Sequence, residues 1–238
     1  MITVSPVATR KELKEFTKFK IKLYAGNPYA VPPLYADERE ALLKGHNPAL
    51  KVYDHQVFLA KRDGKTVGRI VAIINHISNR KTGKACVRFG FIDFVEDFEV
   101  AKALIETVEQ WGRERGMEAI HGPLGFTDFD PEGMLIYGFD EVSTIACLYN
   151  CHLLRALNSN KAEVCDLMLI AAHPTAQNLG AAALLFTEMI PQFQKLGTVY
   201  AESNPELIDN YRIQALWGNF DKVLHKRRAV FAKEIDRK

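Results

Sequence analysis

The stretch Leu167–Phe186, LMLIAAHPTAQNLGAAALLF, decides how this sequence is interpreted. An apolar run leads into His173-Pro174, a short polar loop follows, and small residues then open a helical pattern. Gln177–Ala182 fits the pattern Q/R-x-x-G-x-G/A. A helix N-terminus offers unpaired N–H groups and a partial positive charge, and small side chains let a diphosphate approach the backbone. The stretch therefore predicts a strand, an anion-binding loop and a helix.

The residues around this stretch continue an alternation of strands and helices. No Walker lysine follows the loop, which argues against hydrolysis of nucleoside triphosphates. A helix interrupted by Pro191 is expected over 180–196, because proline lacks the backbone N–H of an interior turn. The expected elements are a strand at 164–172, that helix, a strand at 198–202, a helix at 205–219 and a strand at 224–235.

The first half of the chain has the same character. Thr9 and Glu12 have the spacing of a capping box at the start of a helix. Asp63-Gly64 is a strong hairpin signal between two strands. The expected elements are helices at 10–24 and 35–43, strands at 55–61, 66–76 and 85–95, a turn at 79–83, a helix at 97–115, a strand at 117–121 and a loop at 122–140. Together with the elements of the second half, they make an antiparallel meander and two βαβ units, near 85–121 and 165–202.

The composition is that of an ordinary globular protein. Of its 238 residues, 47% are hydrophobic and 25% are charged, and the net charge is only +2. This balance gives no reason to expect nucleic acid or an anionic membrane as a partner, and no apolar run is long enough to span a membrane. The spacing of Cys147, Cys151, His152 and Cys165 matches no standard zinc pattern, so we expect free thiols, no metal and a cytoplasmic location.

The strand, the His-Pro step, the loop and the helix resemble the acetyl-CoA motif of the GNAT superfamily of N-acetyltransferases. More narrowly, KLYAGNPYAVPPL, DGKTVGRIVAIIN and GPLGFTDFDPEGMLIYGFDE resemble uncharacterised bacterial proteins with two GNAT-like halves. The resemblance implies an α/β fold of α+β type, with a mixed, mainly antiparallel sheet and helices on both faces. It predicts GNAT-like halves at 1–150 and 164–238, packed as one unit, the second carrying the acyl-CoA motif.

The resemblance also implies a binding site for acetyl-CoA or another acyl-CoA as cosubstrate. The loop amides would hold the diphosphate, and the preceding strand would pair with the pantetheine arm. The residues implicated are Ile170, Ala171, Gln177, Asn178, Leu179, Gly180, Ala181, Ala182 and Asn204.

The catalytic groups implied by the resemblance are an acid and a base. In the superfamily an Asn is followed seven positions later by a Tyr that protonates the leaving thiolate. Two alignments fit, Asn204 with Tyr211 and Asn210 with Trp217. Both stay open, and we prefer Tyr211 because an indole cannot act as an acid at neutral pH. Glu202 ends the next strand, where it would serve as base for an amine or simply as a solvated strand-end residue.

Two departures from the family pattern qualify these expectations. The loop Val95–Glu99 carries three carboxylates, which would repel a diphosphate, so the first half is expected to have a degenerate CoA loop. Residues 151–163 stand where the relatives have a longer segment. The central segment is therefore expected to be shortened, and the second half to lack part of its own acceptor-binding walls.

The expected function is an acyl-CoA-dependent N-acyltransferase. Its acceptor would be a small-molecule amine or a peptide amine, and a homodimer is compatible with the sequence. The alternative is a non-catalytic acyl-CoA-binding or scaffold protein that keeps the fold. A third possibility is an unrelated α/β protein in which the six-residue loop pattern occurs by chance.

Overall fold

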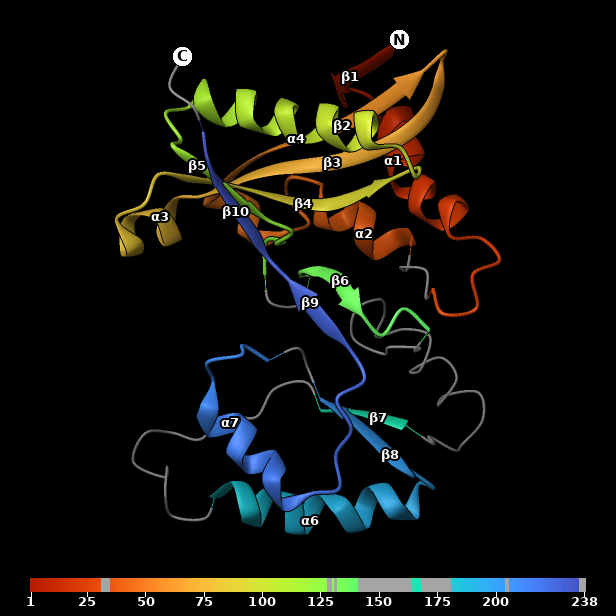
Figure 1. Ribbon diagram of the computed structural model, residues 1–238, viewed down its shortest axis with the longest axis vertical. Helices are drawn as coiled ribbons and strands as arrows, with labels where there is room; N and C mark the ends of the chain where they lie inside the picture. Colours follow the sequence, from red (N-terminus) through yellow and green to blue (C-terminus); the bar gives the residue numbers. More distant parts are fainter. Residues whose placement is uncertain are drawn as a thin grey trace. The chain divides into compact units, whose positions relative to one another are not determined.

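The computed structural model describes residues 1–30, 35–127, 130, 132–140, 164–167, 181–203 and 206–235. The chain divides into two compact units (Figure 1). The first comprises Met1–Phe139 together with Lys226–Lys238, and the second comprises Asp140–His225. The C-terminal segment thus belongs to the first unit, whereas the sequence pattern had grouped it with the second half.

A six-stranded sheet forms the centre of the first unit, in the order β1-β2-β3-β4-β5-β10. All neighbouring strands are antiparallel except β4 and β5, which are parallel. The elements are β1 (Ile2–Pro6), α1 (Arg10–Leu23), α2 (Tyr35–Ala41), a 3-10 helix (Pro48–Lys51), β2 (Tyr53–Arg62), β3 (Lys65–Asn75), α3 (His76–Thr82), β4 (Cys86–Phe94), α4 (Phe98–Arg113), β5 (Ala119–Gly122) and β6 (Met134–Tyr137).

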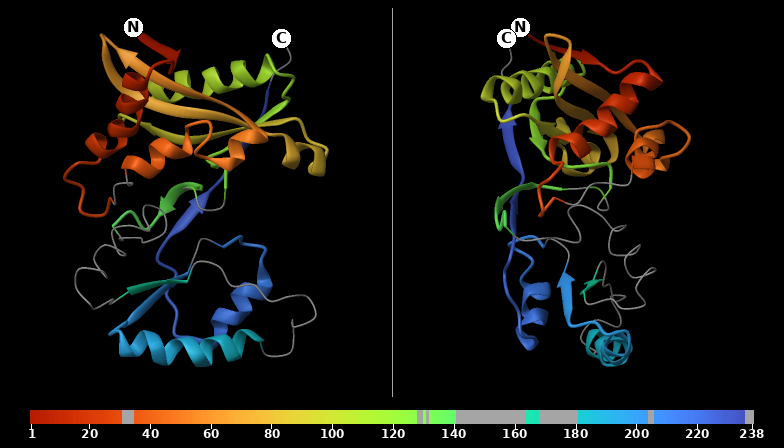
Figure 2. Two further views of the ribbon diagram at one scale, coloured as in Figure 1. Left: turned by 180° about the vertical axis from the view of Figure 1, so that it is seen from behind. Right: turned by 90° about the vertical axis from the view of Figure 1, so that its right-hand side faces the viewer.

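Strand β3 runs through the middle of this sheet and supplies both faces of the core. Its side chains alternate, so Ile70, Ala72 and Ile74 pack beneath α4, and Val71 and Ile73 pack toward α1. A strand buried on both faces needs helices on both sides. Figure 2 shows α1 and α4 on opposite faces. The expected mixed, mainly antiparallel sheet between helices is therefore confirmed.

The two long helices of the first unit begin at side-chain caps, and the sequence predicts the first of them. In α1, Thr9 Oγ1 accepts from the Glu12 amide at 3.2 Å, and Glu12 accepts from the Thr9 amide at 2.9 Å. In α4, Asp97 accepts from the Glu99 amide at 2.9 Å. Such caps typically stabilise a helix by about 1 kcal/mol. The expected capping box and both helices are confirmed.

The C-terminal strands complete the first unit. β9 (Arg227–Ala229) pairs with β6, and β10 (Phe231–Glu234) pairs with β5, both antiparallel. Ile235 is buried in the core beneath α4, and its amide donates to Glu118 at 2.8 Å. Residues more than a hundred positions apart thus share one sheet.

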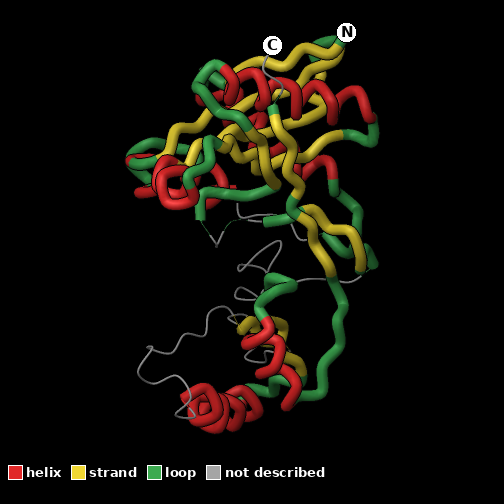
Figure 3. The backbone as a smooth tube through the Cα atoms, turned by 60° about the vertical axis from the view of Figure 1, so that its left-hand side comes forward, coloured by secondary structure: helices red, strands yellow, loops and turns green. Residues whose placement is uncertain are grey.

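The second unit has the expected order of strand, helix, strand and helix (Figure 3). Its elements are β7 (Val164–Leu167), α6 (Ala181–Lys195), β8 (Tyr200–Ser203), α7 (Tyr211–Leu216) and a 3-10 helix (Trp217–Asn219). β7 and β8 pair in parallel, with Asp166 opposite Glu202. Helix α6 runs through Pro191 to Lys195.

Several local expectations were wrong. Residues 76–82 form helix α3 rather than strand end and turn, because the Asn75 side chain caps the Ser78 amide and Gly83, with φ of 68°, ends the helix. Strand β1 was missed, and β6 lies in the expected loop 122–140. Each is a short strand that depends on a distant partner for its pairing. Helix α7 begins at Tyr211, where Asn210 caps it, rather than near residue 205.

Candidate functional site

The motif that opened the sequence analysis ends in the first turn of α6. Parallel strands β7 and β8 flank this helix in sequence, so the expected strand–loop–helix–strand order is present. Ala181 and Ala182 are the first two residues of α6. The other implicated cofactor residues lie outside the described part of the chain: Ile170, Ala171, Gln177, Asn178, Leu179, Gly180 and Asn204.

The N-termini of α6 and α4 differ in charge. The first turn of α6 contains no acidic residue. The first turn of α4 contains Glu99, its N-cap is Asp97, and Arg62 lies 2.6 Å from the Asp97 carboxylate. Hydrogen bonding from Arg62 lowers the pKa of Asp97, so this carboxylate is ionised at neutral pH. An anion can approach the N-terminus of α6 without repulsion from its first turn. The N-terminus of α4 is instead capped by the carboxylate of Asp97.

In the first unit, the chain that follows β5 forms a hydrogen bond to the backbone of β4. The Leu124 amide donates to the Phe89 carbonyl at 2.8 Å. A Cβ on Gly90 would lie 2.4 Å from the Leu124 carbonyl oxygen, so only glycine permits this approach. At Phe91, φ is 51°, a strained left-handed conformation at the irregularity in the β3–β4 register. The chain after β5 therefore occupies this edge of β4.

Glu202 lies on β8 with a nearly buried side chain, 10% exposed. Its Oε1 is 3.2 Å from His225 Nε2. His225 ends the second unit, and the sequence analysis did not select it. The signal that could have found it is weak, because a lone histidine 23 positions from a glutamate has no characteristic spacing.

Tyr211 and Trp217 occupy different environments. Tyr211 is the first residue of α7 and is 74% exposed. The Trp217 indole N–H donates to Glu206, and its ring packs against Phe186 and Phe220, with centroids 5.9 Å away in each case. Trp217 is thus part of an aromatic cluster, and of the two side chains Tyr211 is the more exposed.

A buried ionic network in the first unit was missed by the sequence analysis. Arg69 is 1% exposed and pairs with Glu38 of α2 and with Asp93 of β4, the latter at 2.7 Å. Its guanidinium also lies over the Phe16 ring and donates to the Phe16 carbonyl. Burial alone would lower the pKa of Arg69, but the two carboxylates raise it. The network joins α1, α2 and the irregular part of β4.

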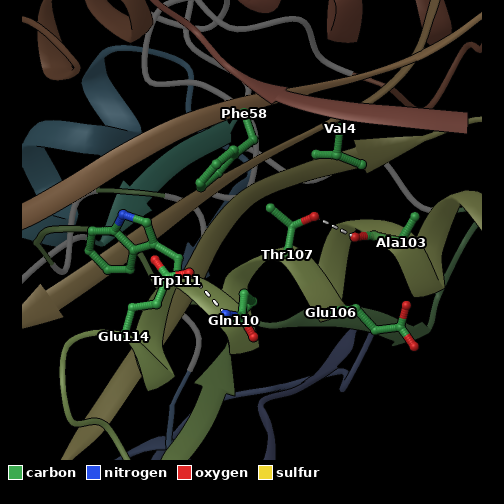
Figure 4. A pocket seen from close by; sticks show the side chains of 8 residues that line it. All are labelled: Val4, Phe58, Ala103, Glu106, Thr107, Gln110, Trp111 and Glu114. Atoms are coloured by element: carbon green, nitrogen blue, oxygen red, sulfur yellow. Dashed lines mark hydrogen bonds between the residues drawn. The ribbon is translucent and has the colours of Figure 1, made fainter.

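A shallow groove of about 460 Å³ lies beside α4 in the first unit. Figure 4 shows Phe58 and Val4 on one side and the α4 residues on the other. Its lining contains two glutamates, Glu106 and Glu114, but no histidine, cysteine or lysine. None of the predicted site residues lines it, and nothing in it resembles an acyl-transfer site.

Among the described residues, no group of three or more histidine, cysteine, aspartate or glutamate side chains is placed to hold a metal ion. Cys147, Cys151 and His152 lie outside those residues. The described helices also include none with the length and apolar character needed to cross a membrane.

Comparison with known proteins identifies the fold. No family model matches the chain. Protein YghO of Escherichia coli is 36% identical over 131 residues, which is 55% of this chain and 33% of that protein. The bacterial ceramide synthase of Caulobacter vibrioides is 35% identical over 140 residues, 58% of this chain and 36% of that protein. The chain thus spans about a third of the length of these curated relatives.

Among solved structures, a tandem GNAT protein from the clavulanic acid biosynthesis pathway aligns over the whole of both chains. The TM-score is 0.61 and the sequence identity is 11%. The chain therefore has the GNAT fold of that protein, as the resemblance in the sequence predicted.

Proposed function

We propose that this GNAT-fold chain is an acyl-CoA-dependent N-acyltransferase whose acyl-CoA site lies in the second unit, at the loop before α6. The observation that carries the proposal is the contrast between the two helix N-termini. The first turn of α6 has no acidic residue and follows Gln177–Gly180, whereas α4 is capped by its own Asp97. Of these two helix starts, that of α6 is the one that suits a diphosphate.

The first unit serves as a scaffold in this proposal. Its β4 edge is already hydrogen-bonded to Leu124, and its loop before α4 carries the carboxylates Glu96, Asp97 and Glu99. The setting would be the cytoplasm, where a buried free thiol such as Cys86 stays reduced.

The reaction is transfer of an acyl group from the thioester sulfur to an amine nitrogen. Backbone N–H groups of the second unit would polarise the thioester carbonyl. The amine forms the new C–N bond, the C–S bond breaks, and Tyr211 supplies a proton to the CoA thiolate. Its exposed position at the start of α7 supports this role over Trp217, whose N–H is engaged by Glu206.

The acceptor is an amine, and one relative suggests its kind. A ceramide synthase, by its name, forms an amide with a long-chain amino alcohol. The identity of 35% over 140 residues supports a primary amine that carries a long apolar chain. A peptide amine is the other class of acceptor, and a panel containing both classes decides between them.

The binding part of the proposal is tested by thermal unfolding with and without acetyl-CoA and palmitoyl-CoA. A ligand that binds only the folded state at a hundred times its Kd stabilises by about 2.7 kcal/mol, so the melting temperature must rise. Gly180→Glu should abolish the rise by placing a carboxylate before α6. Lys102→Glu, which places a carboxylate at an exposed position of α4, is the control and should preserve it. No rise at millimolar ligand would contradict the proposal.

The second candidate function is an acyl-CoA-binding scaffold without turnover. The hydrogen bond of Leu124 to β4 in the first unit and the packing of Trp217 at the aromatic position favour it. Thiol release from acyl-CoA, followed with a panel of long-chain and peptide amines, separates the two functions. A melting-temperature rise without amine-dependent thiol release would favour the scaffold.

A further inference from the structure

Glu202 and His225 form a contact within the second unit. The Glu202 carboxylate is 10% exposed, while the His225 ring is 35% exposed. Nearly buried carboxylates are held by partners, and here Oε1 lies 3.2 Å from His225 Nε2. One end of the pair is thus fixed inside the second unit, and the other end reaches solvent.

The carboxylate meets His225 at one ring nitrogen only. Glu202 Oε1 is 3.2 Å from Nε2, so the other ring nitrogen, Nδ1, takes no part in this contact. In the tautomer with the hydrogen on Nε2, Nδ1 carries the lone pair. Among the residues that the structure describes, none hydrogen-bonds to this nitrogen. A histidine oriented by a carboxylate, with its second nitrogen accessible, is the usual arrangement of a general base.

Histidine suits the chemistry better than the glutamate that the sequence predicts. An aliphatic amine is mostly an ammonium ion at neutral pH and must lose a proton before it can attack. A general base must be able to reach the amine proton, and the His225 side chain is 35% exposed whereas that of Glu202 is 10% exposed. Glu202 is also engaged already by His225, so its role is more naturally to hold the ring.

We infer that His225 is the general base that deprotonates the acceptor amine, and that Glu202 is the positioning residue that holds its ring. This inference rests on the proposed N-acyltransferase function and deepens it. Both residues belong to the second unit, which carries the proposed acyl-CoA site. The parallel pairing of β7 and β8 places Glu202 at the penultimate position of β8, near its carboxyl end, where α/β proteins commonly place functional groups.

The proton balance is complete without a further reactant. The ammonium group gives one proton to His225 Nδ1, and the resulting imidazolium is stabilised by the Glu202 carboxylate. The neutral amine attacks the thioester carbonyl carbon, and the C–S bond breaks. The nitrogen loses its second proton as the thiolate is protonated through Tyr211. Amide and free thiol are the products, and the proton on His225 returns to solvent.

The experiment compares two small amines in the thiol-release assay with acetyl-CoA and the full chain. Ethylamine is mostly protonated at neutral pH, and methoxyamine is mostly neutral. His225→Ala should lower kcat with ethylamine by about 10²- to 10⁴-fold, the usual contribution of general base catalysis. The loss with methoxyamine should be far smaller, because that amine needs no prior deprotonation. Added imidazole should restore part of the ethylamine rate, and Glu202→Gln should give a smaller loss.

The control variant is His76→Ala. His76 pairs with Asp54 at 2.9 Å on the first unit, so it is a similar pair away from the proposed site. It should leave both rates unchanged. The acetyl-CoA-induced rise in melting temperature should persist in His225→Ala, which shows that the variant folds and binds.

Equal losses with the two amines, or no loss, in a variant that still binds acetyl-CoA would overturn the base assignment and leave the proposed function intact. A wild-type chain that binds acetyl-CoA but turns over neither amine would overturn the transferase function and this inference together.

Discussion

Arg69 carries a positive charge into the core of the first unit between two carboxylates, those of Glu38 and Asp93. Removing it would leave both carboxylates buried without a counter-ion. Breaking a buried pair in this way typically destabilises a protein by about 3–5 kcal/mol. We therefore expect Arg69→Met to lower the free energy of unfolding by that amount, measured by urea denaturation.

Arg62→Met is the matched control, because Arg62 pairs with Asp97 at the partly exposed start of α4. Its loss should be about 1 kcal/mol or less. The triple variant R69M/E38Q/D93N should recover much of the stability lost in Arg69→Met, since the unpaired charges are gone. A loss in Arg69→Met no larger than in Arg62→Met would contradict the role assigned to the network.

His55 and His121 make the stability of the first unit depend on pH. Burial lowers the pKa of both side chains, and nearby positive charges add to the effect: Lys44 at His55, and Arg88 with Lys84 at His121. The folded state then binds fewer protons than the unfolded state. The stability that these two neutral histidines contribute is fully present above the ordinary histidine pKa of 6.5. It is lost as the pH falls below that value.

We expect the free energy of unfolding to decline between about pH 7 and pH 5 for this reason. His121→Gln should show a shallower decline than the wild type. His46→Gln, at an exposed position, should match the wild-type slope. The measurement is urea denaturation at a series of pH values, and a wild-type curve that stays flat across this range would refute the prediction.

At the scale of elements, the C-terminal strand β10 holds the first unit together. Ile235 is 5% exposed in the core beneath α4, whereas Val230, five positions earlier, is 50% exposed. Truncating a buried isoleucine to alanine typically costs about 2–5 kcal/mol. We expect Ile235→Ala to lose about that much on urea denaturation and Val230→Ala to lose less than about 0.5 kcal/mol. Similar losses for the two variants would show that β10 is not an integral strand.

Elements with strong local signals were predictable from the sequence. Helix α4 repeats apolar residues at helical spacing and begins at Asp97, and β3 is a long β-branched run, so both are found where the pattern placed them. Strands β1 and β6 have five and four residues and depend on partners far away in sequence. Pairing at that distance leaves no periodic trace, so local patterns could not assign these strands.

The candidate site shows the same limit at the residue scale. The loop pattern Gln177–Ala182 and the strand-end Glu202 follow from local sequence. The contact between Glu202 and His225 joins residues of the second unit that are 23 positions apart, and the Arg69 network joins two helices and two strands. These contacts exist only because the fold brings the segments together.

At the scale of the whole molecule, the chain has one fold type and two units of different character. The first has a large buried core, and its strand β4 is hydrogen-bonded by the chain that follows β5. The second has the loop pattern and a helix start without acidic residues. We therefore expect one acyl-CoA per chain, and isothermal titration with acetyl-CoA should give a stoichiometry near one. A stoichiometry near two would show that both units bind.

The central claim, that acyl-CoA binds at the loop before α6, is tested most directly by hydrogen exchange of the full chain with and without acetyl-CoA. The account predicts that backbone amides in 168–186 become protected on binding, while those in 94–100 at the start of α4 exchange at unchanged rates. Protection confined to 94–100, or no change in either segment at saturating acetyl-CoA, would contradict it.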